Sequence, residues 1–135
     1  MNVSRERAGT ERPQYRIGVV DDDPGVRRAL SRLLRVTGHQ VRTFGSAEEL
    51  LALGRLGELD CLVLDVYLGG MSGVDLHTEL TTVGQPPPTV FITAHDDAIV
   101  ATRCLCADGV VCLPKPFEDD ALLTAITQAM GAIRP

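Results

Sequence analysis

The sequence lacks several features that would place a protein in a special class. No apolar run approaches the ~18 residues of a membrane-spanning helix. The segment 1–16 is polar and contains arginine, with no apolar core, so a secretory signal is not expected there. The four cysteines do not form the C-x-x-C pairs of zinc sites, and buried free thiols in a reducing cytoplasm are expected instead. The sequence therefore predicts a cytoplasmic protein without membrane contact.

A positive net charge is also missing. The formal net charge is −5 and the isoelectric point is about 5.1, which argues against direct nucleic-acid binding by this domain. Hydrophobic residues make up 44% and charged residues 23% of the chain, as in a soluble globular protein. The length fits one domain. We expect a flexible leader over 1–15, a folded domain over 16–131 and a short tail over 132–135.

Short apolar segments alternate with amphipathic ones along the chain. Strands are expected at 17–20, 41–44, 61–65, 89–93 and 110–113. Helices are expected at 24–37, 47–53, 74–82, 97–107 and 118–130. Five strands alternating with five helices predict an α/β fold, in which helices cover both faces of a doubly wound, five-stranded parallel sheet. Strands buried on both faces explain why their sequences are almost entirely apolar.

Particular residues mark where helices begin and end. Asp23 suits the N-cap position, because Pro24 follows it at the first helical position. Ser46 and Glu49 form the pattern of a capping box. Gly38 suits the position just after a helix. The two histidines at 39 and 77 are expected at the surface.

Polar residues follow four of the five predicted strands. Asp21 and Asp22 follow the first strand, Asp65 ends the third, Thr93 ends the fourth and Lys115 follows the fifth. In open α/β sheets the working site lies at the carboxyl ends of the strands, so these side chains are expected to converge. Clustered carboxylates repel one another unless a cation neutralises them, and Mg²⁺ prefers such oxygen ligands. The set suits phosphoryl transfer to a carboxylate, with an ammonium and a hydroxyl placed to contact the phosphoryl oxygens.

Four short motifs, in a fixed order along the chain, contain or adjoin these polar residues and resemble a known family. They are VVDDDP at 19–24, LD at 64–65 with MSG at 71–73, FITA at 91–94 and KPF at 115–117. Together they closely resemble the receiver domain of bacterial two-component response regulators, over about residues 16–130. The resemblance implies the sheet order 2-1-3-4-5, which is the flavodoxin-like order.

The resemblance also implies a role for each site residue. Asp65 would accept a phosphoryl group from a sensor histidine kinase or a small phosphodonor. Asp22 would bind Mg²⁺ directly, Asp21 would help directly or through water, and Asp65 and the backbone carbonyl of Tyr67 would be further ligands. Beyond self-phosphorylation and self-dephosphorylation, no enzymatic activity is expected.

The remaining expectations from the resemblance concern activation and output. Thr93 would contact the phosphoryl group, Lys115 would pair with its oxygens, and the peptide bond from Lys115 to Pro116 would be cis. The fourth helix, fifth strand and fifth helix would form the signalling face, which often pairs with a second copy. A DNA-binding output domain would follow if the chain is a fragment. Two positions depart from the family: Gly69 replaces a frequent proline, and Cys112 replaces the aromatic residue that often reports activation.

Two alternative functions remain open at this point. A haloacid-dehalogenase-like phosphohydrolase also uses a nucleophilic aspartate, and Asp21-x-Asp23 fits its D-x-D pattern. However, Pro24 and Gly25 stand where that family has glycine or valine and then threonine, and no cap insertion is visible. The other alternative is a receiver-like scaffold that is never phosphorylated, which the intact acidic set disfavours.

Overall fold

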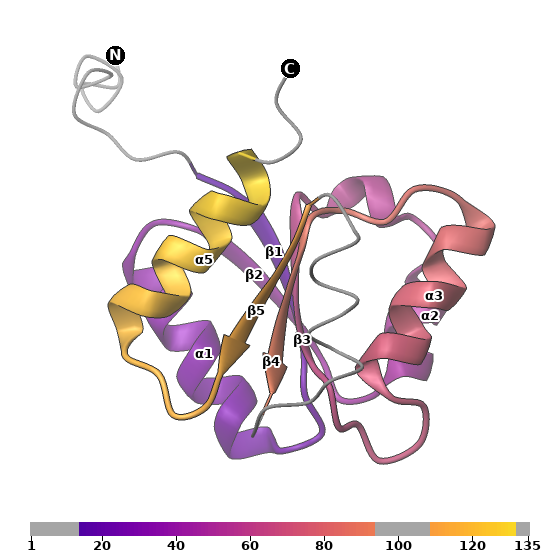
Figure 1. Cartoon of the computed structure of the whole chain (residues 1–135), viewed down its shortest axis with the longest axis horizontal. Helices are drawn as coiled ribbons and strands as arrows, with labels where there is room; N and C mark the ends of the chain where they lie inside the picture. The colour runs from indigo at the N-terminus through magenta and orange to yellow at the C-terminus, as the bar shows by residue number, and fades with distance from the viewer. Residues whose placement is uncertain (1–13, 94–108, 132–135) are drawn as a thin grey trace.

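The computed structural model describes residues 14–93 and 109–131. Its elements alternate along the chain as the sequence predicts (Figure 1). In order, they are β1 (Arg16–Val20), α1 (Pro24–Val36), β2 (Gln40–Phe44), α2 (Ala47–Leu53), the short 3-10 helix η2 (Leu56–Glu58), β3 (Cys61–Asp65), α3 (Gly73–Val83), β4 (Thr89–Thr93), β5 (Val110–Pro114) and α5 (Asp119–Gly131). The helix expected at 97–107 lies outside the described residues.

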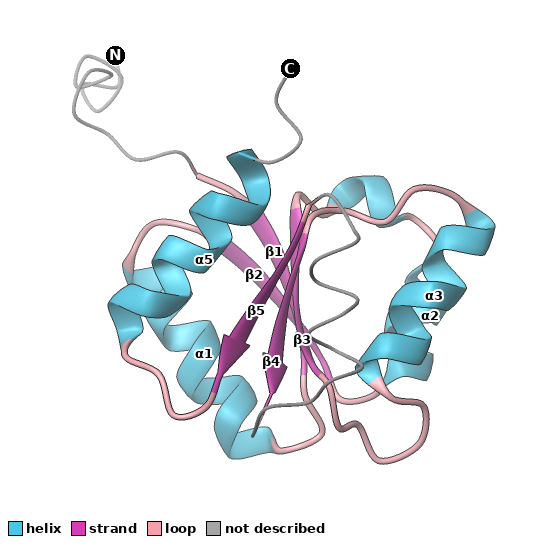
Figure 2. Ribbon diagram, in the orientation of Figure 1, coloured by secondary structure: helices cyan, strands magenta, loops and turns pink. Residues whose placement is uncertain are grey.

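All five strands form one parallel sheet in the order β2-β1-β3-β4-β5, so the predicted fold class and strand order are confirmed. Helices α1 and α5 cover one face of the sheet, and α2 and α3 lie on the other (Figure 2). Because consecutive parallel strands need a crossover, every connection returns the chain to the same edge of the sheet. The carboxyl ends of all strands therefore meet at one edge.

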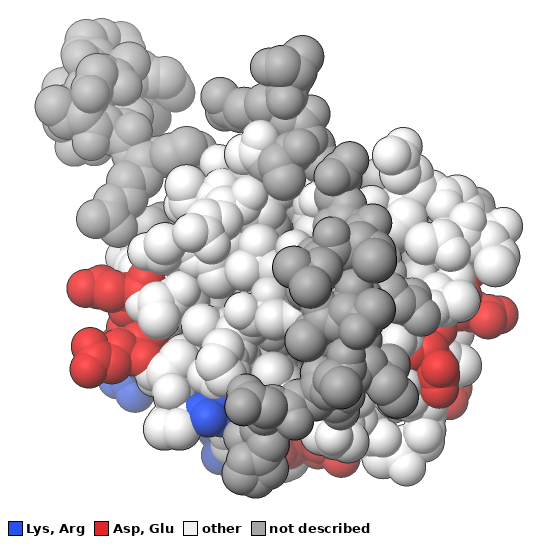
Figure 3. Space-filling model, in the orientation of Figure 1, with Lys and Arg blue, Asp and Glu red and all other residues white. Residues whose placement is uncertain are grey.

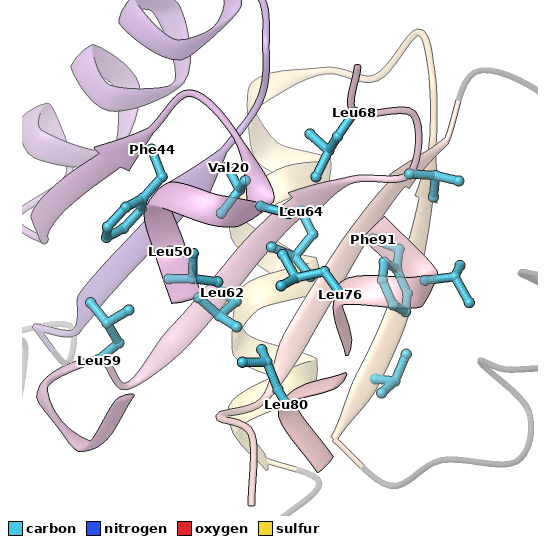
Figure 4. Packing of buried hydrophobic residues seen from close by; sticks show 14 residues of the cluster. Val20, Phe44, Leu50, Leu59, Leu62, Leu64, Leu68, Leu76, Leu80 and Phe91 are labelled. Atoms are coloured by element: carbon cyan, nitrogen blue, oxygen red, sulfur yellow. The ribbon is translucent and has the colours of Figure 1, made fainter. Parts of the chain in front are cut away.

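The sheet separates two hydrophobic clusters. In β3, Cys61 and Val63 face the cluster under α1 and α5, whereas Leu62 and Leu64 face the cluster under α2 and α3. Figure 4 shows the second of these clusters, where leucines from α2 and α3 meet Phe91 of β4. Every residue of β3 is buried, which explains its unbroken apolar sequence. Packing on both faces therefore fixes the position of β3, the strand that ends in Asp65.

The helix signals act largely as predicted. The Asp23 side chain accepts hydrogen bonds from the first turn of α1, and Ser46 accepts one from the backbone N–H of Glu49. Gly38 has a positive φ of 102° just after α1, a conformation that favours glycine. The return bond of the capping box differs from the expected one: the Glu49 carboxylate accepts from the N–H of Gly45, at 2.8 Å. Glu49 therefore ties the turn before α2 to the helix.

Both described histidines differ from the expected surface position. His77 is only 6% exposed and packs edge-on against Phe91. It lies one residue after Leu76 and three before Leu80, so the helical repeat turns it toward the sheet with these two leucines. His39 is half-buried, its ring stacks on Tyr15, and its Nδ1 accepts a hydrogen bond from the Tyr15 N–H at 3.1 Å.

The cysteines divide into two kinds. Cys61 is a buried free thiol, as expected, and burial raises its pKa to about 12. Cys112 is disulfide-bonded, so the expectation of a free thiol is wrong at this position. Sequence spacing identifies zinc motifs, but it does not tell which sulfurs a fold brings together. Cys104 and Cys106 lie outside the described residues.

The described part of the chain contains no helix with the length and apolar character that crossing a membrane requires. On the face shown in Figure 3, acidic side chains gather over the beginning of α5 and again on the side of α2 and α3. The first group comprises the exposed residues Glu118, Asp119 and Asp120. These charges lie where they complement the positive end of the α5 dipole.

Candidate functional site

Three aspartates meet at the carboxyl edge of the sheet. Asp21 and Asp22 follow β1, and Asp65 is the last residue of β3, the strand that pairs with β1. One carboxylate oxygen of each lies within 4.8 Å of the others. Asp21 and Asp65 are buried, whereas Asp22 is exposed. The expected convergence of the three carboxylates is confirmed, and the cluster opens to solvent on the side of Asp22.

Asp21 is held firmly but keeps one oxygen without a hydrogen bond. Its backbone N–H donates to the carbonyl oxygen of Phe44 at 3.1 Å, and its Oδ1 accepts from the N–H of Asp23 at 2.9 Å. Its Oδ2 is buried and has no hydrogen-bond partner among residues 14–93 and 109–131. A buried carboxylate oxygen without a donor is costly, so this atom fits a cation ligand.

The electrostatics of Asp21 reflect this position. Burial raises the pKa of Asp21 to about 6. The Asp23 N–H lowers this pKa, the neighbouring Asp65 carboxylate raises it, and the Lys115 charge lowers it by less. Without a cation, the folded protein thus resists full ionisation of the cluster. A bound divalent ion would remove that resistance.

The two oxygens of Asp65 have different neighbours. Oδ1 accepts a hydrogen bond from the N–H of Tyr67 at 3.0 Å, and Oδ2 lies 3.5 Å from Nζ of Lys115. Lys115 is fixed through its backbone N–H, which donates to the carbonyl oxygen of Thr93 at 2.6 Å. The ends of β3, β4 and β5 are therefore joined around Asp65.

The remaining predicted site residues lie close by. Thr93 ends β4 and is buried, at 6% exposure. Tyr67 contacts Asp65 through its backbone, and the residue as a whole is 59% exposed. That its carbonyl binds a metal stays a prediction. The peptide bond between Lys115 and Pro116 is cis, as expected.

A glycine explains how the loop after β3 fits against the site. The N–H of Gly73 donates to the carbonyl oxygen of Val66 at 2.8 Å, and a Cβ at Gly73 would collide with the carbonyl oxygen of Asp65. The close approach excludes any side chain at this position. The MSG motif therefore lets α3 begin directly beside the end of β3, with Ser72 as its N-cap.

The site contains one residue that the sequence analysis did not identify. Arg27, in α1, donates from Nη1 to the carbonyl oxygen of Asp21 at 2.6 Å. The available signal was the arginine itself: a cation so near the N-terminus of a helix is unfavourable for the helix dipole. Asp23, by contrast, caps α1 with its side chain, which supports the predicted structural role.

The donor set fits a divalent metal ion. Three carboxylates, one with an orphan buried oxygen, supply the hard oxygen ligands that Mg²⁺ and similar ions prefer. Lys115 lies on the side of Asp65 and leaves Asp22 open to solvent. Chemically, the arrangement combines a cation site with a carboxylate next to an ammonium, as transfer of a phosphoryl group to an aspartate requires.

Comparisons with known proteins agree with this geometry. The family model described as "Response regulator receiver domain" matches residues 17–127. "Nodulation protein W" of Bradyrhizobium diazoefficiens is 43% identical over 82% of this chain and 49% of its own length. The solved response regulator StyR is 43% identical, with a TM-score of 0.75 over 86% of this chain and 59% of that chain.

A solved structure of similar size gives the same result. The response regulator receiver protein from Burkholderia phymatum is 38% identical, with a TM-score of 0.71, and the match covers 89% of this chain and 98% of that chain. The curated relatives, in contrast, are about twice as long as their matched segments. From these matches and from its strand-end site, the chain belongs to the receiver-domain family of two-component response regulators.

Proposed function

We propose that the protein accepts a phosphoryl group on Asp65 in a Mg²⁺-dependent reaction and passes the signal on through protein contacts. The observation that carries this proposal is the placement of the Asp65 carboxylate between the Lys115 ammonium, at 3.5 Å, and the Asp21–Asp22 pair. A sensor histidine kinase is the proposed donor, and a small acyl phosphate can replace it.

The two oxygens of Asp65 suit different tasks. Oδ1 is held by the Tyr67 N–H, so Oδ2, beside Lys115, forms the new bond to phosphorus. With acetyl phosphate, the bond between phosphorus and the bridging oxygen breaks, and acetate leaves with that electron pair. Lys115 moves from the carboxylate to a phosphoryl oxygen, and the Thr93 hydroxyl binds another. The ground-state contact at 3.5 Å is loose enough to be exchanged.

Mg²⁺ would be held by Asp21, Asp22, Asp65 and the Tyr67 carbonyl, and it would neutralise charge on the phosphoryl oxygens. The chain supplies the rest. The Phe44 carbonyl and the Asp23 N–H hold Asp21 in place and leave its buried Oδ2 without a protein donor, so this oxygen is the one proposed to bind the cation. Asp22 remains exposed, so the cation and the donor can enter from solvent.

We propose no catalytic activity on other molecules. We expect only self-phosphorylation and hydrolysis of its own acyl phosphate, in the cytoplasm. A phosphohydrolase of the D-x-D type would need Asp23 as a catalytic acid, but this side chain accepts hydrogen bonds from the N–H groups of Gly25 and Val26. The first alternative is therefore not favoured.

The output side is proposed from the family. Since this chain spans about half the length of its curated relatives, a DNA-binding output domain in the other half of a longer protein is a proposed partner. A homodimer through the fourth helix, β5 and α5 is the second proposed contact. Of that surface, only β5 and α5 belong to the described residues.

The test is phosphorylation by acetyl phosphate with Mg²⁺, followed by intact-mass and peptide mass spectrometry. We expect one added phosphoryl group, located on Asp65, and none on the Asp65→Asn variant. Asp60→Asn is the matched control, because Asp60 precedes the same strand at its opposite end and pairs with Arg16. A label that persists on Asp65→Asn, or that forms equally well in EDTA, would refute the proposal.

A further inference from the structure

Arg27 occupies a position that helix stability does not explain. It lies in α1 four residues after the N-cap Asp23, and the first turn of α1 contains no acidic residue. Near this end of a helix the dipole disfavours cations. Among described residues, Arg27 has no ion pair within salt-bridge distance. Within the described residues, the one hydrogen bond of its side chain goes to the backbone carbonyl oxygen of Asp21.

That hydrogen bond is the third of three that hold Asp21 in place. The backbone N–H of Asp21 donates to Phe44, its Oδ1 accepts from Asp23, and its carbonyl oxygen accepts from Arg27 Nη1 at 2.6 Å. Arg27 is the one side chain among these three partners. With the backbone held on both sides and Oδ1 occupied, the Asp21 carboxylate has little freedom to reorient, and its buried Oδ2 remains the oxygen without a donor among the described residues.

The loop after β2 is shaped to admit the guanidinium. A Cβ at Gly45 would lie 3.1 Å from Nη1 of Arg27 and 3.4 Å from Oε2 of Glu49. Gly45 has no positive φ, so its lack of a side chain is not explained by its backbone conformation. The Glu49 carboxylate holds the Gly45 N–H at 2.8 Å. Arg27 thus spans from α1 across the loop before α2 to the end of β1.

We propose that Arg27 is a positioning residue for the metal site, which holds Asp21 so that its Oδ2 faces the cation. The proposal rests on the proposed Mg²⁺ site and adds a residue outside the acidic cluster to it. Arg27 acts through a hydrogen bond to the backbone and not by touching the cation. A hydrogen bond from a charged donor is strong enough to fix the orientation of the residue that accepts it. Outer partners of this kind commonly change metal affinity.

The neighbouring arginines provide matched controls. Arg28 and Arg32 line an open groove of about 840 Å³ along the outer side of α1, and both are exposed. Neither side chain has a hydrogen bond or ion pair to the described part of the chain. Replacing Arg28 by alanine removes the same charge from the same turn of the helix without removing a contact to Asp21.

The experiment measures Mg²⁺ binding by calorimetry and the thermal stability of each protein with and without Mg²⁺. For Arg27→Ala we expect a Kd for Mg²⁺ that is higher by roughly ten- to a hundred-fold, and a smaller Mg²⁺-induced rise in Tm. Arg28→Ala should keep the wild-type Kd. Arg27→Lys, which keeps the charge and one donor, should bind Mg²⁺ more tightly than Arg27→Ala.

A second route leaves Arg27 in place. Gly45→Ala puts a methyl group against Nη1, so it should also weaken Mg²⁺ binding, and it carries the test if Arg27→Ala does not fold. A purely structural role would lower Tm equally with and without Mg²⁺ and leave Kd unchanged, and that result overturns the inference. If the wild-type protein itself does not bind Mg²⁺, the proposed metal site fails as well, so the two failures can be told apart.

Discussion

Replacing Asp21 by asparagine should stabilise the protein when no metal is bound. Burial favours the neutral form of this carboxyl group and raises its pKa from an ordinary value near 3.8 to about 6. At neutral pH Asp21 is therefore mostly ionised in the folded protein, although the folded state is more stable when this group is protonated. Asparagine keeps an oxygen that can accept from the Asp23 N–H and replaces the orphan Oδ2 by an uncharged group.

The magnitude follows from the pKa. Each unit corresponds to about 1.36 kcal/mol, so ionised Asp21 costs the folded state about 2–3 kcal/mol. The cost is absent when the group is protonated in both states, and it grows as pH rises from the unfolded-state pKa through the folded-state pKa. Since the folded state binds the extra proton, the free energy of unfolding of the wild type should fall between about pH 4 and 7 by this amount.

The assay is urea unfolding followed by circular dichroism, in EDTA, at several pH values across this window. The chain has no tryptophan, so intrinsic fluorescence is a weak probe. Asp21→Asn should match the wild type near pH 4 and exceed it by about 2–3 kcal/mol near pH 7.5. Asp22→Asn is the control, because it makes the same substitution in the same cluster at a side chain that is exposed rather than buried. An Asp21→Asn gain that is absent, or equal at both ends of the pH range, would refute the reasoning.

Three further predictions test the site and the core that supports it. Gly73→Ala should destabilise the fold by about 1–3 kcal/mol and slow Asp65 phosphorylation, because its methyl group meets the Asp65 carbonyl; Gly57→Ala, with open space around it, is the control in urea unfolding. Cys61 should resist thiol reagents in the native state at pH 8, since burial raises its pKa to about 12, and peptide mapping should show its labelling only after unfolding. Lys115→Arg should lower the rate of phosphorylation by acetyl phosphate by about tenfold or more, whereas an unchanged rate would show that any cation suffices.

The positions of the acidic residues could be predicted from the sequence because a parallel sheet imposes them. Once β1 and β3 are identified by their apolar runs, Asp21 and Asp65 must lie at the same edge, whatever the helices do. The caps at Asp23 and Ser46 were equally predictable, because their hydrogen bonds reach only two or three residues along the chain. Local and topological rules were sufficient for both.

Contacts that depend on where a side chain points in the folded structure were not predictable in the same way. Arg27 reaches the Asp21 backbone, and His77 packs on Phe91 across a helix–sheet interface. Neither contact follows from spacing along the chain, because both depend on the direction that a side chain takes in the finished fold. The surface assignment of His77 failed because histidine as a residue type is only intermediate in burial, whereas the helical repeat places this one with the buried Leu76 and Leu80.

A lysine at position 115 suits the proposed chemistry better than an arginine would. Of the 13 basic residues, Lys115 is the one lysine, so arginine is otherwise the rule in this chain. An arginine fork would bind both oxygens of Asp65 in a bidentate pair and hold the carboxylate closed. The lysine ammonium instead lies 3.5 Å from one oxygen and leaves the other to the Tyr67 N–H. In the proposed reaction, a compact point charge on a flexible stem can leave the carboxylate when a phosphoryl group arrives, so the 3.5 Å contact suits an Asp65 that must stay available as the acceptor.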